Sequence, residues 1–138
     1  IKALNYFKEN QILIPLLFLS PTLIHLTHYG NDDFVSKGCG IGREATIFLL
    51  EKGVRLTGTD GWSWDAPFVH TAKTYAETKD AGLIWEGHRA GMHQGYSHIE
   101  KLANLSELPS HGFMISAFPF KIKNASAGFT RVVAILEE

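Results

Sequence analysis

Histidines gather in one stretch of the chain, G-H-R-A-G-M-H-Q-G-Y-S-H-I-E-K-L, which contains His88, His93, His98 and Glu100. Imidazole and carboxylate groups bind zinc and manganese, and both can also transfer protons. His93 and His98 are five residues apart and would share a helix face poorly, whereas in a strand His98 and Glu100 point to the same side. His98 and Glu100 are therefore a geometrically possible pair, although a histidine taken singly is more often a surface or hydrogen-bonded side chain.

A second segment with chemical potential is G-T-D-G-W-S-W-D-A-P-F, which places Asp60 and Asp65 around Trp62 and Trp64. Carboxylates beside indole rings can have raised pKa values or face an aromatic substrate pocket. The same pattern also fits a turn anchored by tryptophan, in which the aspartates accept backbone N–H groups. The sequence leaves both interpretations open and slightly favours the turn. Trp62, Trp64 and Asp65 are our candidate substrate-binding residues.

The sequence lacks the marker motifs of several protein classes. The chain has no C-x-x-C, H-E-x-x-H, glycine-rich phosphate loop or G-x-S-x-G motif. Its 13 basic and 14 acidic residues leave a net charge of −1 and form no basic stripe, which argues against a nucleic-acid partner. The single cysteine, Cys39, cannot form an internal disulfide, so we expect a reducing, cytoplasmic location. The apolar run 12–26 is too short for a bilayer and is broken by Pro15 and Pro21, so we expect no membrane partner.

The composition is that of a globular protein, and its periodicity predicts a mixed α/β fold in one domain, 1–138. Ile41, Ala45, Phe48 and Leu49 fall at helical spacing before Gly53, which predicts a helix at 43–51. The segment 54–59 reads as a strand after that helix, and 66–80 fits a helix or an ordered lid. Further strand candidates are 12–19, L-I-W-E-G, Y-S-H-I-E-K-L, G-F-M-I-S-A-F-P-F-K-I and F-T-R-V-V-A-I-L. We expect one sheet that includes strands near 54–59, 113–118 and 130–135, packed against the helix.

Taken in order, several motifs of residues 29–138 resemble the C-terminal part of the cyclase family. These motifs are G-R-E-A-T, G-T-D-x-W-S-x-D, E-K-L-x-N-L and a final G-x-x-R. The family consists of metal-dependent hydrolases and includes bacterial kynurenine formamidases and isatin hydrolases. The resemblance implies an α/β swivelling β/β/α fold, here incomplete at its N-terminal side, a homo-oligomer, and a divalent metal site that hydrolyses small amide, lactam or related carbonyl substrates.

The family's ligand motif, H-x-G-T-H-x-D-x-P-x-H, does not occur in these 138 residues. The resemblance does retain a later histidine followed twelve residues on by a glutamate, and these fall on His88 and Glu100. It implies that the two residues are metal ligands for zinc or manganese, or that they transfer protons to a leaving nitrogen; the choice stays open. Two ligands are too few for a catalytic zinc, so we expect the isolated chain to hold no metal tightly and to be inactive.

Residues 1–28 depart from the family pattern, because F-L-S-P-T-L-I-H-L-T-H-Y-G does not keep the expected strand, Gly-Asp turn and T-G-W segment. A degraded or truncated gene product would explain this start and the missing motif, and a piece of a longer protein would explain the missing motif alone. The leading hypothesis is a hydrolase fragment. The alternative is a non-catalytic assembly or binding domain that retains the cyclase core.

Overall fold

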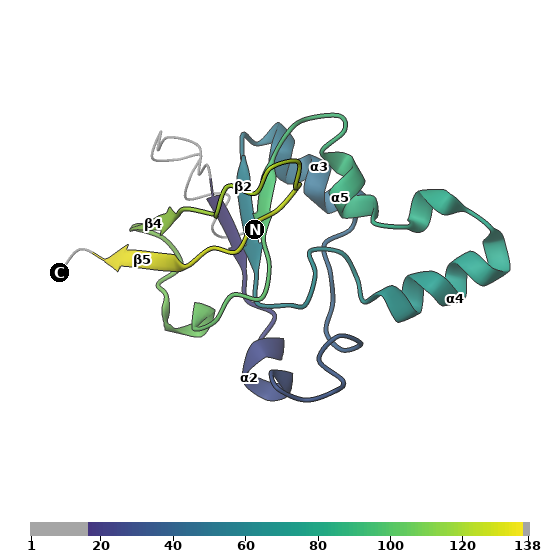
Figure 1. Ribbon diagram of the computed structural model, residues 1–138, viewed down its shortest axis with the longest axis horizontal. Helices are drawn as coiled ribbons and strands as arrows, with labels where there is room; N and C mark the ends of the chain where they lie inside the picture. The colour runs from purple at the N-terminus through teal and green to yellow at the C-terminus, as the bar shows by residue number, and fades with distance from the viewer. Residues whose placement is uncertain (1–16, 137–138) are drawn as a thin grey trace. The chain divides into compact units, whose positions relative to one another are not determined.

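The computed structural model describes residues 17–136, and these form two compact units, the first ending at Ser106 and the second beginning at Glu107. The first unit is mixed α/β, which confirms the predicted fold class at that level. Its centre is a parallel sheet in the order β1-β2-β3, formed by β1 (Leu17–Ser20), β2 (Leu56–Thr59) and β3 (Ser97–Ile99) (Figure 1). The predicted strand at 54–59 is confirmed as β2. Of the strand predicted at 12–19, residues 17–19 lie in β1 and the remainder lies outside the described residues.

Helix α3 (Arg43–Glu51) has the predicted bounds. It begins after the extended Gly42 and buries Thr46 and Leu50 on one face, and Gly53, with a φ of 92°, turns the chain toward β2. Parallel neighbours need such a crossover connection. Helix α5 (Glu86–Ala90) packs beside α3, and Figure 1 shows the two helices next to each other.

The remaining helices of the first unit are short or exposed. α2 (Ile24–His28) follows β1, and α4 (Phe68–Thr78) confirms the helical interpretation of 66–80. The 3-10 helix η1 (Ala81–Leu83) follows α4, and η2 (Leu105–Glu107) lies where the two units meet in the sequence. Within residues 17–136, no helix has the length and apolar character needed to cross a membrane.

The strand predicted for L-I-W-E-G, residues 83–87, is wrong. Trp85 has the left-handed backbone conformation, with a φ of 51°, and α5 begins at the next residue. Asp65 accepts the N–H groups of Gly87 and His88 and so anchors the first turn of this helix. A contact with a residue more than 20 positions earlier therefore overrides the local strand propensity.

The second unit contains an antiparallel pair, β4 (Phe113–Ala117) and β5 (Val132–Leu136). Both strands were predicted near these positions, at 113–118 and 130–135. The expectation that they join the sheet of β2 is wrong, because among the described residues they pair only with each other. β2 itself is paired on both sides, with β1 and with β3, so no further strand can pair with it directly.

The core of the first unit lies around Trp64. Its side chain is fully buried, as is that of Thr46, and the indole N–H donates to Thr46 Oγ1 at 3.0 Å. Leu50 and Ala90 are also fully buried or nearly so, and they bring α3 and α5 into the same core. A buried indole N–H usually has such a partner. The loop after β2 is therefore fixed to α3 by a side chain that carries both apolar surface and a hydrogen bond.

Candidate metal and acid–base site

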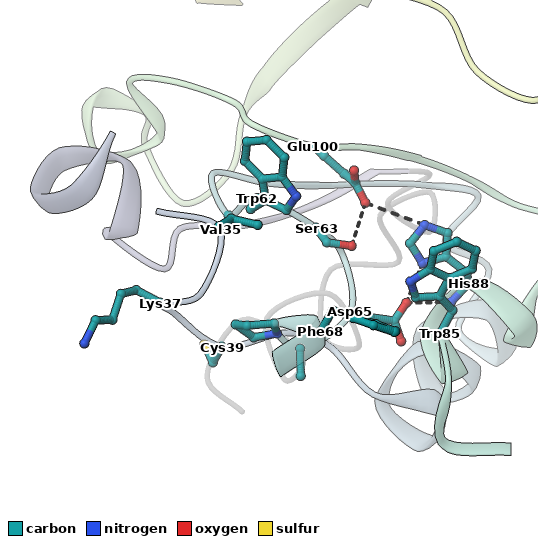
Figure 2. A pocket seen from close by; sticks show the side chains of 13 residues that line it. Val35, Lys37, Cys39, Trp62, Ser63, Asp65, Phe68, Trp85, His88 and Glu100 are labelled. Atoms are coloured by element: carbon teal, nitrogen blue, oxygen red, sulfur yellow. Dashed lines mark hydrogen bonds and ion pairs between the residues drawn. The ribbon is translucent and has the colours of Figure 1, made fainter. Parts of the chain in front are cut away.

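His88 and Glu100, the two residues singled out by the family resemblance, lie close together. The Nε2 atom of His88 is 3.7 Å from Oε1 of Glu100 (Figure 2). His88 comes from α5 and Glu100 directly follows β3, so a short helix and the carboxyl end of a strand supply the pair. Both line a pocket of about 360 Å³. The two side chains are thus as close as a shared metal site requires, and their roles as ligands or acid–base groups stay predictions.

Asp65 holds His88 in place. One of its carboxylate oxygens, Oδ2, accepts hydrogen bonds from the His88 backbone N–H at 3.0 Å and from His88 Nδ1, while the other accepts from Gly87 N–H at 2.6 Å. Because Nδ1 is engaged by Asp65, His88 turns Nε2 toward Glu100. A carboxylate on the far nitrogen is the arrangement that orients many metal-binding histidines.

The electrostatics of this pair follow from its contacts. The hydrogen bond to Asp65 raises the pKa of His88 above its ordinary value, although burial opposes the shift. Burial would raise the pKa of Asp65, but hydrogen bonds from the His88 side chain and from two backbone N–H groups outweigh it and lower that pKa. The interpretation of Asp65 as a carboxyl with a raised pKa is therefore wrong. The turn interpretation is confirmed, since Asp60 also accepts a backbone N–H, from Thr22 at 2.7 Å.

Two glycines allow the backbone to crowd around Asp65. A Cβ atom on Gly40 would lie 2.0 Å from the backbone nitrogen of Ala66, and one on Gly87 would lie 2.5 Å from the carbonyl oxygen of Ile41. The Ile41 N–H also donates to the Trp64 carbonyl at 2.7 Å. These close approaches bring the loop before α3, the loop after β2 and the start of α5 together at the site.

Glu100 is held by the loop after β2. Its Oε1 atom accepts from the Trp64 N–H at 2.8 Å and from Ser63 Oγ at 3.1 Å. Its other oxygen lies 3.5 Å from Nζ of Lys101, an ammonium group that also sits 4.5 Å from the ring centroid of Trp62. The carboxylate therefore has two hydrogen-bond donors on one oxygen and an ammonium group near the other.

His98 also joins the cluster. Its Nε2 atom lies 3.5 Å from Glu100 Oε1, which confirms the geometric pairing of His98 with Glu100, and its ring centroid is 4.3 Å from that of His88. Burial, together with the nearby charge of His88, lowers the pKa of His98. His93 lies apart from this cluster and contacts Arg43, with Nε2 2.5 Å from Nη2.

The three candidate substrate-binding residues occupy different positions. Trp62 is 46% exposed and lines the pocket, and Asp65 also lines it from beneath His88. Trp64 is fully buried and is not part of the pocket lining. Sequence reasoning did not include Ser63 in the site, and nothing in its local sequence signals a contact with Glu100.

Tyr96 is a further residue near the site that sequence reasoning missed. Its hydroxyl donates to the Gly87 carbonyl at 2.8 Å, and its ring lies 5.6 Å from that of His98. Burial, with the charges of Asp65 and Glu100, raises the pKa of Tyr96. The phenol therefore stays protonated and links the segment before β3 to α5.

A family model matches part of the chain. The family model described as "Putative cyclase" matches residues 17–66. This segment is similar to the cyclase family. The cyclase match includes Asp60, Trp62, Trp64 and Asp65, and it also includes residues 17–28, which we expected to diverge. It ends before His88 and Glu100, so their assignment rests on the motif order and on the geometry above. No curated protein and no solved structure matches the chain significantly.

Proposed function

We propose that this chain supplies part of the active site of a metal-dependent hydrolase that acts on amide, lactam or related carbonyl bonds, in a swivelling β/β/α fold. The observation that carries this proposal is the line of contacts Asp65–His88–Glu100. A cyclase-family carboxylate orients a histidine, and that histidine faces a second carboxylate across 3.7 Å at the wall of a pocket.

The residues present fit a divalent cation. The donor set combines imidazole nitrogen and carboxylate oxygen, which suits zinc or manganese. His88 and Glu100 would hold the ion, and Asp65 would fix the ring of His88 through Nδ1. Bound there, a divalent ion supplies Lewis acidity that polarises a carbonyl group and activates water.

Proton transfer is the alternative role of His88, because an Nε2 atom bound to an ion has no proton to give. With no ion bound, Nε2 of His88 faces Glu100 at the pocket wall, and the hydrogen bond to Asp65 raises the pKa of His88, which favours a protonated ring able to donate to a leaving nitrogen. Glu100 is the alternative acid–base group. Trp62 and Trp85 line the same pocket and provide aromatic walls for a small substrate.

The remaining ligands of the family's site would have to come from residues outside this sequence. The isolated chain is accordingly expected to be inactive as a hydrolase. We further propose that the enzyme is a cytoplasmic homo-oligomer, since its one cysteine is a free, exposed thiol and apolar side chains are exposed in both units.

A complementation assay tests the proposal. The chain is co-purified with the part of a cyclase-family protein that carries H-x-G-T-H-x-D-x-P-x-H, and hydrolysis of an N-formyl aromatic amine and of a lactam is measured with zinc or manganese. We expect metal-dependent turnover that falls at least about 100-fold in His88→Ala, the scale of a lost acid–base group. His70→Ala, at an exposed position on α4, is the matched control and should keep full activity.

The assay also separates this function from the alternative of a non-catalytic assembly domain. Phe118, Phe120 and Phe129 of the second unit are 74–84% exposed, which is the kind of surface that a partner would cover. Turnover that is unchanged by both His88→Ala and Glu100→Gln would contradict the hydrolase site. A stable complex without any turnover would favour the assembly role.

A further inference from the structure

His98 brings a third metal-binding group to the pair formed by His88 and Glu100. The Nε2 atoms of the two histidines lie 3.5 and 3.7 Å from the same oxygen, Glu100 Oε1, and one ligand atom from each of the three residues lies within 4.8 Å of the others. Around a tetrahedral zinc ion with bonds of about 2.0–2.1 Å, neighbouring ligand atoms are about 3.3–3.4 Å apart. Two of the three separations therefore come within about half an ångström of what zinc requires.

We propose that His98 is a metal ligand, so that His88, His98 and Glu100 together bind one divalent cation, with zinc the best fit, using this chain alone. The proposal rests on the function proposed above and changes the count of ligands from two to three. Three protein ligands with water in the fourth position make a catalytic zinc site, whereas two leave the ion mostly hydrated.

Contacts with neighbouring residues hold the three metal-binding residues in position, which lowers the free-energy cost of organising a metal site. Asp65 fixes the ring of His88, and the loop after β2 fixes Glu100 through the Trp64 N–H. The backbone of His98 is held in β3, which pairs with Thr57 of the central strand. Its ring lies parallel to the buried indole of Trp64, with centroids 6.5 Å apart.

The same contacts would also suit a cluster without metal, in which a protonated His88 lies between the carboxylates of Asp65 and Glu100. The two arrangements differ in the need for His98. An ion-pair network centred on His88 loses little when His98 is removed, whereas a three-ligand site loses its ion. The required experiment therefore measures metal binding directly and compares the two histidines.

Zinc binding to the intact chain is measured by calorimetric titration, and cobalt binding is followed by visible absorption, which reports the coordination geometry. We expect one ion per chain in the wild type. Both His88→Ala and His98→Ala should weaken zinc binding by more than about 10-fold. Loss of a residue that only hydrogen-bonds to a metal ligand already weakens metal affinity by about 10-fold or more, and loss of a ligand itself should cost more. His93→Ala, an exposed histidine of the same segment, is the matched control and should bind as the wild type does.

His98→Gln keeps a polar side chain of similar size and guards against a folding defect in His98→Ala, and circular dichroism checks both variants. Weakened binding in His98→Gln with a native spectrum supports the proposal. Wild-type affinity in a folded His98 variant, with loss of binding only in His88→Ala, overturns the role of His98 and leaves the proposed function intact. No stoichiometric binding by the wild type also overturns this proposal, while the complementation assay still tests the function. Loss of metal binding in the His98 variants but not in His88→Ala would contradict both the three-ligand site and the proposed role of His88.

Discussion

Replacing Asp65 by asparagine tests whether one carboxylate organises the site. Asp65 is 5% exposed, and its two oxygens accept three hydrogen bonds, from Gly87 N–H, His88 N–H and His88 Nδ1. Asparagine offers one oxygen and places an N–H₂ group where the other oxygen was. Whichever way the amide turns, at least one buried donor then faces another donor.

The expected loss of stability follows from these contacts. A buried donor left without a partner costs about 1–3 kcal/mol, and a hydrogen bond to a neutral acceptor is about 1 kcal/mol weaker than one to a charged acceptor. Since the side chain of His88 is 32% exposed, water softens part of this effect. We expect Asp65→Asn to lower the free energy of unfolding by about 2–4 kcal/mol, a large share of the 5–15 kcal/mol that is usual for a domain.

The effect should depend on pH in a defined way. The pKa of Asp65 is lowered in the folded state, so its stabilisation is present above the ordinary value of 3.8 and is lost as the pH falls through the folded pKa. The pKa of His88 is raised, so its contribution is fully present below the ordinary value of 6.5 and is lost as the pH rises through the folded pKa. The difference in unfolding free energy between the wild type and Asp65→Asn should therefore be greatest between pH 3.8 and pH 6.5.

Urea unfolding in the presence of a chelator, followed by circular dichroism at several pH values, measures this difference. Asp80→Asn is the matched control, because Asp80 is exposed, accepts a single backbone N–H from Gly82 at 2.8 Å, and asparagine caps such a turn nearly as well. It should change stability by less than about 0.5 kcal/mol. If Asp65→Asn behaves like this control throughout the range, Asp65 does not hold α5 at the site.

Three further predictions concern the same unit and the chain as a whole. Gly40→Ala should destabilise the fold by at least about 3 kcal/mol in thermal or urea unfolding, because its Cβ would lie 2.0 Å from the Ala66 nitrogen. Gly95→Ala is the control and should be neutral, because a Cβ there has open space around it. Equal stability of the two variants would contradict the close approach at Gly40. Proton NMR titration should give His88 a pKa above 6.5 that falls in Asp65→Asn, and an unchanged pKa would show that their hydrogen bond is not formed. The isolated chain should associate through its exposed apolar side chains, so a compact monomer in sedimentation at micromolar concentrations would count against this expectation.

The sequence predicted those parts of the fold that depend on neighbouring residues. Helix α3 was bounded correctly because helical spacing and the stop at Gly53 are local signals. The alternation of a strand likewise placed His98 and Glu100 on one side, as the structure has them. Both inferences needed only a few residues of sequence.

What the sequence did not predict depends on contacts between distant segments. The segment around Trp85 looks like a strand until Asp65 anchors the helix that follows it. β4 and β5 were located individually, but whether they join β2 depends on which strand edges are free, and periodicity carries no such information. The hydrogen bond from His88 to Asp65 spans 23 positions, so no local pattern could show that Asp65, predicted as a substrate-binding residue, also contacts His88.

Trp64 connects the core of the first unit to the candidate site through two hydrogen bonds. The indole N–H of this residue donates to Thr46 on α3, while its backbone N–H donates to Glu100. Binding of an ion at the proposed site would therefore be thermodynamically linked to folding of the core through this one residue. An ion present at about 100 times its dissociation constant would stabilise the folded chain by about 2.7 kcal/mol. By the same linkage, a core substitution such as Thr46→Val, which removes the partner of the indole N–H, would lower the apparent metal affinity wherever it leaves part of the chain unfolded.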